Sequence, residues 1–313
     1  MRVLSLSGGG FQGLFSALCL NHLEQETGQP LNKMFDMFAG TSVGAITATA
    51  GAVGMPMSKV VDIFEKQGVK IFSGRPAPVT STAIARDFMR YVNKAKYDGG
   101  ELNRVISAYC GDMKMGDLDT PLLITAVRLH DGEPVVFTRE THPDVLISDA
   151  VMASAAAPMM FPPVLVNGSL HADGGLFANC PDHLALAYAK GGLGADVSDV
   201  RMLSVGAMNK CPPLTEPTSP NMGVMGWLSE NRIFRTIISS QAIMAESMVK
   251  AEIGQNYMRV DACSEGPGRA HVGLDVADEK SVKAIHIAAE SCYDEIVSCE
   301  HLIYDETDDL TSG

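Results

Sequence analysis

Residues 34–54 read MFDMFAGTSVGAITATAGAVG. The short apolar run Met34–Phe38 leads into the motif Gly40–Thr41–Ser42–Val43–Gly44, and small residues then continue as far as Gly54. The G-x-S-x-G pattern is typical of a sharp strand-to-helix turn that lifts a serine hydroxyl clear of the backbone, and its glycines remove side chains that would clash there. The stretch therefore predicts a strand, a turn that presents Ser42, and a helix. The alternative interpretation is a tightly packed turn with a purely structural serine.

A similar strand and helix precede this stretch. Arg2–Leu6 is predicted to be a short buried strand, and the helix that begins near Phe11 is stopped by Gly28 and Pro30. An order of strand, helix, strand and helix implies a parallel sheet with right-handed crossovers. The loops after the two strands are then expected to lie side by side at one edge of the sheet.

The loop after the first strand is rich in glycine, with the sequence Gly8–Gly9–Gly10–Phe11–Gln12–Gly13. Successive glycine N–H groups at the start of a helix form an anion site. The spacing also satisfies the dinucleotide fingerprint G-x-G-x-x-G, but that fingerprint needs an acidic residue at the end of the second strand, and Asp36 lies inside it. We favour a cradle for the oxyanion of an acyl transfer next to Ser42.

A nucleophilic serine needs a base. Histidine is the usual base, but His130, His142 and His171 have no distinctive setting. Asp173 ends a predicted strand and is followed by Gly174–Gly175, a turn that can aim a carboxylate into a crevice. A buried aspartate can accept the serine proton when the dry surroundings raise its pKa. Asp173 is therefore the predicted general base.

The remaining pattern indicates one domain over residues 1–313. Residues 56–110 look helical and irregular and are predicted to form a cap-like segment, and residues 222–313 a helical C-terminal extension. Residues 59–104 contain nine Lys and Arg against five Asp and Glu. Arg75, Arg86 and Arg90 are candidate contacts for an anionic ligand, because guanidinium groups match phosphate geometry. The alternative is that these charges only solubilise the cap.

The composition limits the partners and the location of the protein. A net charge of −13 makes the chain a poor general ligand for nucleic acid, so no nucleic-acid partner is expected. Met1 leads directly into an apolar strand without the basic region of a secretory signal. The weakly polar stretch 39–54 is too short to span a bilayer. These features predict a cytoplasmic protein.

Several of these motifs together resemble the patatin-like phospholipases. They are the GGGxxG loop, the GTSVG turn, Asp173–Gly174–Gly175, and the run from Ala153 to Pro163, which together cover about residues 1–206. The resemblance implies a three-layer α/β/α sandwich with a mainly parallel central sheet. It also implies a Ser42–Asp173 catalytic dyad and an oxyanion hole from Gly8, Gly9 and Gly10, with no metal and no cofactor. Gln12 departs from the Arg or Lys that the family usually has at this position.

The compact chain, with its first motif at the N-terminus and a helical tail, is also similar to bacterial patatin-like effectors of anti-phage signalling. That similarity implies a serine acyl-lipid hydrolase of the phospholipase A or lysophospholipase type, activated by a cyclic nucleotide. Its substrate would be membrane phospholipid or another acyl lipid at the inner membrane surface, and a homodimer is compatible with it. The alternatives are an esterase or thioesterase on small acyl compounds, and a catalytically silent binding module.

Overall fold

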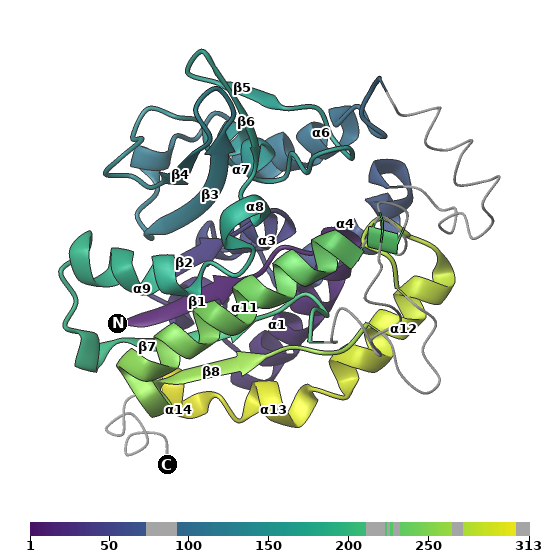
Figure 1. The fold of residues 1–313 in the computed structure, drawn as a ribbon. Helices are drawn as coiled ribbons and strands as arrows, with labels where there is room; N and C mark the ends of the chain where they lie inside the picture. Colours follow the sequence, from purple (N-terminus) through teal and green to yellow (C-terminus); the bar gives the residue numbers. More distant parts are fainter. Residues whose placement is uncertain (73–92, 211–222, 224–225, 228–231, 265–271, 305–313) are drawn as a thin grey trace.

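The structure, a computed structural model, describes residues 1–72, 93–210, 223, 226–227, 232–264 and 272–304. These residues form one eight-stranded sheet with helices on both faces (Figure 1). Arg75, Arg86 and Arg90, the predicted anion contacts, lie outside the described residues.

Most strand pairs of the sheet are parallel. The parallel strands, in spatial order, are β3 (Leu122–Arg128), β2 (Met37–Gly40), β1 (Arg2–Leu6), β7 (Arg201–Val205) and β8 (Tyr257–Val260). The antiparallel strands at the β3 end are β4 (Glu133–Phe137), β6 (Ser169–Asp173) and β5 (Val164–Val166). The mainly parallel sheet predicted from the sequence is confirmed.

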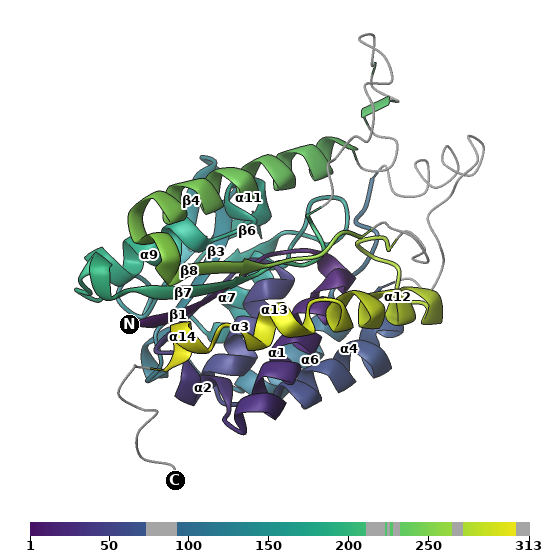
Figure 2. The same ribbon diagram turned by 90° about the horizontal axis from the view of Figure 1, so that it is seen from below.

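Side chains of the central strands alternate between two cores, one on each face of the sheet. Leu4 and Phe38 belong to the larger core, whereas Val3 and Met37 belong to the smaller one. Successive residues of a strand point to opposite faces, so two apolar faces require two helical layers. Figure 2 shows the layers edge-on, and the three-layer prediction is confirmed.

The larger core is covered by helices from both ends of the chain. They include α1 (Gly13–Thr27), α2 (Leu31–Met34), α3 (Val43–Ala52), α4 (Met57–Ile71), α6 (Gly100–Cys110), α7 (Ile147–Ser154), α12 (Glu279–Glu290), α13 (Tyr293–Val297) and α14 (Glu300–Ile303). The smaller core is covered by α9 (Asp182–Gly191) and α11 (Arg232–Ile253), and the short α8 (Gly175–Ala178) follows β6.

The hairpin turn between β5 and β6 has the residues that its geometry requires. Asn167 and Gly168 have φ angles of 48° and 79°, as a two-residue hairpin turn between β5 and β6 requires. β2, however, begins at Met37 rather than Met34, because residues 31–34 form the single turn of α2.

The prediction of a helical C-terminal extension is wrong for Tyr257–Val260, which forms the edge strand β8. A four-residue strand that contains Arg259 has too little apolar periodicity to be seen in the sequence, and its pairing with β7 decides its conformation. The neighbouring helix α11 has 22 residues. No helix in the described part of the chain is both long enough and apolar enough to span a bilayer.

Candidate active site

Two strands meet end to end along one edge of β3. β4 occupies the opposite edge, where it pairs with Ile124–Arg128. On the shared edge, β2 ends with Gly40 opposite Ile124, and β6 ends with Asp173 opposite Ala126. Because β2 is parallel to β3 and β6 is antiparallel to it, their carboxyl ends face each other. This arrangement brings Ser42 and Asp173 to the same place from positions 131 residues apart.

Ser42 lies in a strained turn between β2 and α3. Its φ and ψ angles are 56° and −126°, a conformation that residues with a side chain rarely adopt. A Cβ atom on Gly40 would lie 2.4 Å from the carbonyl oxygen of Gly44, and one on Gly44 would lie 2.3 Å from that of Leu6. Both glycines of the motif are therefore required by close backbone packing.

Hydrogen bonds from two other motifs hold this turn in place. The backbone N–H of Ser42 donates to the hydroxyl of Ser154 in α7 at 2.8 Å. The Thr41 hydroxyl donates to the carbonyl of Ala178 in α8 at 2.6 Å. Ser154 was quoted above only as part of the family resemblance, and its role as an anchor of the turn has no sequence signal of its own.

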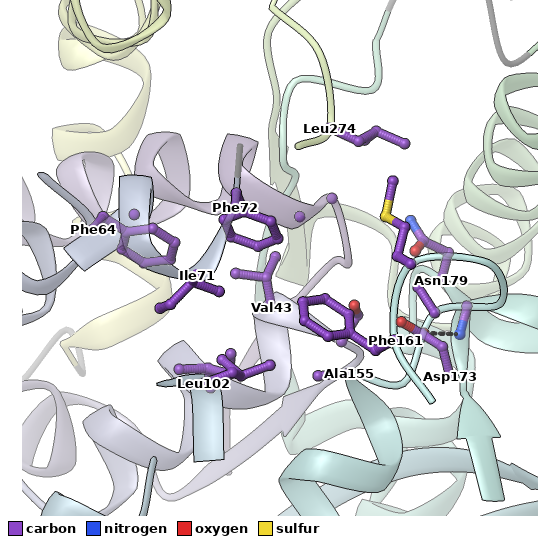
Figure 3. A pocket seen from close by; sticks show the side chains of 18 of the residues that line it. Val43, Phe64, Ile71, Phe72, Leu102, Ala155, Phe161, Asp173, Asn179 and Leu274 are labelled. Atoms are coloured by element: carbon purple, nitrogen blue, oxygen red, sulfur yellow. Dashed lines mark hydrogen bonds between the residues drawn. The ribbon is translucent and has the colours of Figure 1, made fainter. Parts of the chain in front are cut away.

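Asp173 lies at the end of β6 with 5% of its surface exposed. Its Oδ1 accepts a hydrogen bond from the N–H of Gly175 at 2.7 Å, drawn as the dashed line in Figure 3. Burial raises the pKa of Asp173 to about 6, although hydrogen bonds from the Ser42 hydroxyl and the Gly175 N–H act in the opposite direction. A carboxylate of this kind is ionised at neutral pH and still basic enough to accept a proton.

The glycine loop lies beside the serine, but its three glycines are not equivalent. Gly9 and Gly10 line the same pocket as Ser42 and Asp173. The N–H of Gly8 instead donates to the carbonyl of Asn179 at 2.9 Å. A backbone amide has a single proton to donate, so the N–H of Gly8 is not available as the oxyanion donor that was predicted. Of the three predicted donors, the N–H groups of Gly9 and Gly10 are left as candidates.

Gly8 serves as the anchor of this loop. Its carbonyl accepts hydrogen bonds from the side-chain amides of Asn179 and Asn209, both at 3.0 Å. A Cβ atom on Gly8 would lie 2.4 Å from Oδ1 of Asn179. Asn179 follows α8 and Asn209 comes after β7, and the sequence indicated a role for neither.

The contacts of Gln12 account for the presence of this residue where the family usually has Arg or Lys. Its buried amide donates to the carbonyl of Val272 at 2.6 Å, and the N–H of Phe11 donates to Leu274 at 2.7 Å. Leu274 also lines the pocket, so the segment from Val272 to Asp275 lies across the glycine loop. A neutral amide satisfies one buried carbonyl without bringing an unpaired charge into the interior.

A buried ion pair supports Asn209 from behind the loop. The Arg259 guanidinium lies 2.9 Å from Oδ2 of Asp261, and both side chains are buried. The other oxygen of Asp261 accepts a hydrogen bond from the N–H of Asn209 at 3.1 Å. Arg259 also donates to Ser7, the residue before the glycine loop, at 3.3 Å.

We expect Asp261→Ala to destabilise the protein by about 3–5 kcal/mol, because it leaves the charge of Arg259 buried without this partner. Thermal unfolding of the purified variant measures the loss. The control is Asp112→Ala, which removes an exposed carboxylate. Equal melting temperatures for the two variants would contradict a supporting role for the ion pair.

The pocket around these groups is mainly apolar. Its lining includes Val43, Ile46, Phe64, Ile71, Phe72, Leu102 and Phe161, most of which are labelled in Figure 3. None of its described lining residues is a histidine. His171 points elsewhere, with Nδ1 3.0 Å from the carbonyl of Ser169 and its ring packed against Phe137. The geometry favours a dyad of Ser42 and Asp173 over a triad with histidine.

Comparison with known proteins identifies the family. The patatin-like phospholipase family matches residues 4–186, more than half of the chain. The chain belongs to this family. The predicted class, a lipid acyl hydrolase on a patatin-like fold, is therefore confirmed.

Three bacterial proteins are among the relatives of this chain. A cGAMP-activated phospholipase from Pseudomonas aeruginosa is 32% identical over 268 residues, which cover 83% of this chain and 78% of the relative. A second cGAMP-activated phospholipase, from Vibrio cholerae, is 29% identical over 310 residues, or 90% of this chain and 87% of the relative. A cUMP-AMP-activated phospholipase from Escherichia coli is 30% identical over 222 residues, which are 66% and 64% of the two chains.

Proposed function

We propose that the protein is a phospholipase that uses Ser42 as nucleophile and Asp173 as general base. The observation that carries this proposal is the position of Asp173, which is buried within hydrogen-bonding reach of the Ser42 hydroxyl at one end of an apolar pocket. An ionised carboxylate in a dry site is a competent base for a serine hydroxyl.

The reaction follows from these positions. The Asp173 carboxylate takes the proton of Ser42 as Oγ attacks the ester carbonyl, and the N–H groups of Gly9 and Gly10 donate to the resulting oxyanion. The protonated Asp173 then returns the proton to the departing alcohol, which leaves an acyl ester on Ser42. Water, deprotonated by Asp173, attacks this ester and releases the fatty acid, and the proton goes back to Ser42.

The residues at the mouth of the pocket support the proposal that the substrate comes from a membrane. Met159, Leu176 and Ile237 line the pocket and still have 63%, 42% and 38% of their surfaces exposed. Exposed apolar residues gathered around an opening are typical of a lipid- or protein-binding surface. We place the enzyme at the inner membrane surface, where its acyl-lipid substrate would enter past these side chains.

The names of the relatives support an activating ligand. Three of them are described as activated by cGAMP or cUMP-AMP, so we propose a cyclic dinucleotide activator and a role in anti-phage defence for this chain. We also keep the single domain over residues 1–313, in which the described helices of the cap-like segment, α4 and α6, form one wall of the pocket.

The proposal is tested with purified protein, phospholipid vesicles and a panel containing cGAMP and cUMP-AMP. We expect free fatty acid to appear only when one of these nucleotides is present, since activation requires a ligand that binds the active state more tightly than the resting state. Full activity without any nucleotide would contradict the proposed activator.

Turnover of short-chain esters without turnover of vesicles would indicate the esterase or thioesterase. Failure of a fluorophosphonate probe to label Ser42 would indicate the silent binding module.

A further inference from the structure

The apolar pocket has an arm that leads away from the catalytic residues. Figure 3 shows Asp173 and Asn179 on one side and Phe64, Ile71 and Leu102 on the opposite side. The arm lies between α3, α4 and α6, all of which contribute lining residues. Its walls are apolar, so it offers a favourable environment to a hydrocarbon chain but none to a polar headgroup.

α3 and α4 form a helical hairpin that gives the arm its direction. α3 begins next to Ser42, and the hairpin turn follows it, where the N–H of Met55 donates to the carbonyl of Ala50 at 2.9 Å. α4 then returns to the active site, because Phe72 at its end packs against Phe11 of the glycine loop. The turn of the hairpin is therefore the end of the arm farthest from the nucleophile.

The length of the arm follows from the residues on one face of α3. Val43, Ile46 and Ala50 line the pocket at helical spacing, and Ala50 lies about 10 Å beyond Val43 at a rise of 1.5 Å per residue. Ala50 and Val60 are buried and line the far end together with Met55. Since Ala50 has only 1% of its surface exposed, this end is closed to solvent near its side chain.

We propose that this arm holds the acyl chain of the substrate and that Ala50, Met55 and Val60 set the longest chain that it accepts. The inference rests on the proposed phospholipase function and adds a determinant of chain-length specificity. The carbonyl carbon would lie at Ser42, the chain would run along α3, and its methyl end would reach the hairpin turn. The glycerol and headgroup would remain toward Met159, Leu176 and Ile237.

Ala50 is the residue whose enlargement should show this most clearly. Ala50 is buried and lines the pocket, so the added carbons of Ala50→Leu should reduce the space at this end of the arm. Each methylene excluded from an apolar site costs about fourfold in binding. Three added carbons should lower the ratio of kcat/KM for palmitate to kcat/KM for butyrate by roughly 50-fold.

The experiment measures this ratio with p-nitrophenyl butyrate, octanoate and palmitate, without nucleotide and with cGAMP or cUMP-AMP. Ala50→Val should give a smaller shift in the same direction, and it provides a second reading if Ala50→Leu folds poorly. Val60→Ala, which lengthens the arm, should shift the preference toward palmitate. The matched control is Ala187→Leu, the same change at an exposed position on α9, and it should leave the ratio at the wild-type value.

The outcomes separate this inference from the proposed function. A graded loss of palmitate preference from Ala50→Val to Ala50→Leu supports the acyl arm. A folded Ala50→Leu variant with the wild-type ratio overturns it, while hydrolysis by the wild type would still support the Ser42–Asp173 site. Absence of wild-type activity on every ester, with cGAMP and with cUMP-AMP, would overturn both.

Discussion

Ser42→Ala is expected to lower phospholipid hydrolysis by at least about 10⁴-fold while the protein remains folded, since loss of a catalytic nucleophile removes the covalent pathway. The alanine would inherit the φ angle of 56°, so the substitution does not relieve the strain of the turn. The measurement is fatty-acid release from vesicles in the presence of an activating nucleotide, together with labelling by a fluorophosphonate probe.

The matched control for this variant is Ser107→Ala, which removes an exposed hydroxyl on α6. It should retain both labelling and turnover. If folded Ser42→Ala were to hydrolyse vesicles at a rate within tenfold of the control, a different nucleophile would have to be sought.

Asp173→Asn is expected to be nearly as damaging as the loss of Ser42, because an amide cannot accept the serine proton. In the wild type, kcat/KM should decline as the pH falls through about 6, the pKa to which burial raises Asp173, because protonated Asp173 is no longer a base. A pH profile of kcat/KM measures this limb. A profile that is flat from pH 8 to pH 5 would exclude Asp173 as the essential base.

The same variant should be more stable than the wild type at neutral pH. The pKa of Asp173 is higher in the folded protein than its ordinary value, so its contribution to stability is fully present below pH 4 and is lost as the pH rises through about 6. Asp173→Asn should therefore raise the free energy of unfolding by roughly 2–3 kcal/mol at pH 7. The gain should nearly disappear at pH 4. If the variant were less stable than the wild type at pH 7, burial of the ionised Asp173 carboxylate would not be destabilising.

The sequence by itself determined the local chemistry of this protein. A G-x-S-x-G motif requires two glycines for backbone packing, and the contacts of Gly40 and Gly44 show why no other residue fits there. The parallel order of the first strands, the hairpin at Asn167–Gly168 and the position of Asp173 before two glycines also follow from short-range rules of turns and periodicity. Each of these features depends on residues that are close together in the chain.

Only the tertiary structure decided which of these groups meet, because their encounters depend on strand pairing across long separations. β2 and β6 share one edge of β3, and this places Ser42 against Asp173. Pairing also turns Tyr257–Val260 into a strand and brings Arg259 and Asp261 behind the glycine loop. The backbone carbonyl of Asn179 accepts a hydrogen bond from the N–H of Gly8, so the number of oxyanion donors could not be predicted from the glycines alone. A backbone amide has one N–H to donate, and the fold determines which acceptor it meets.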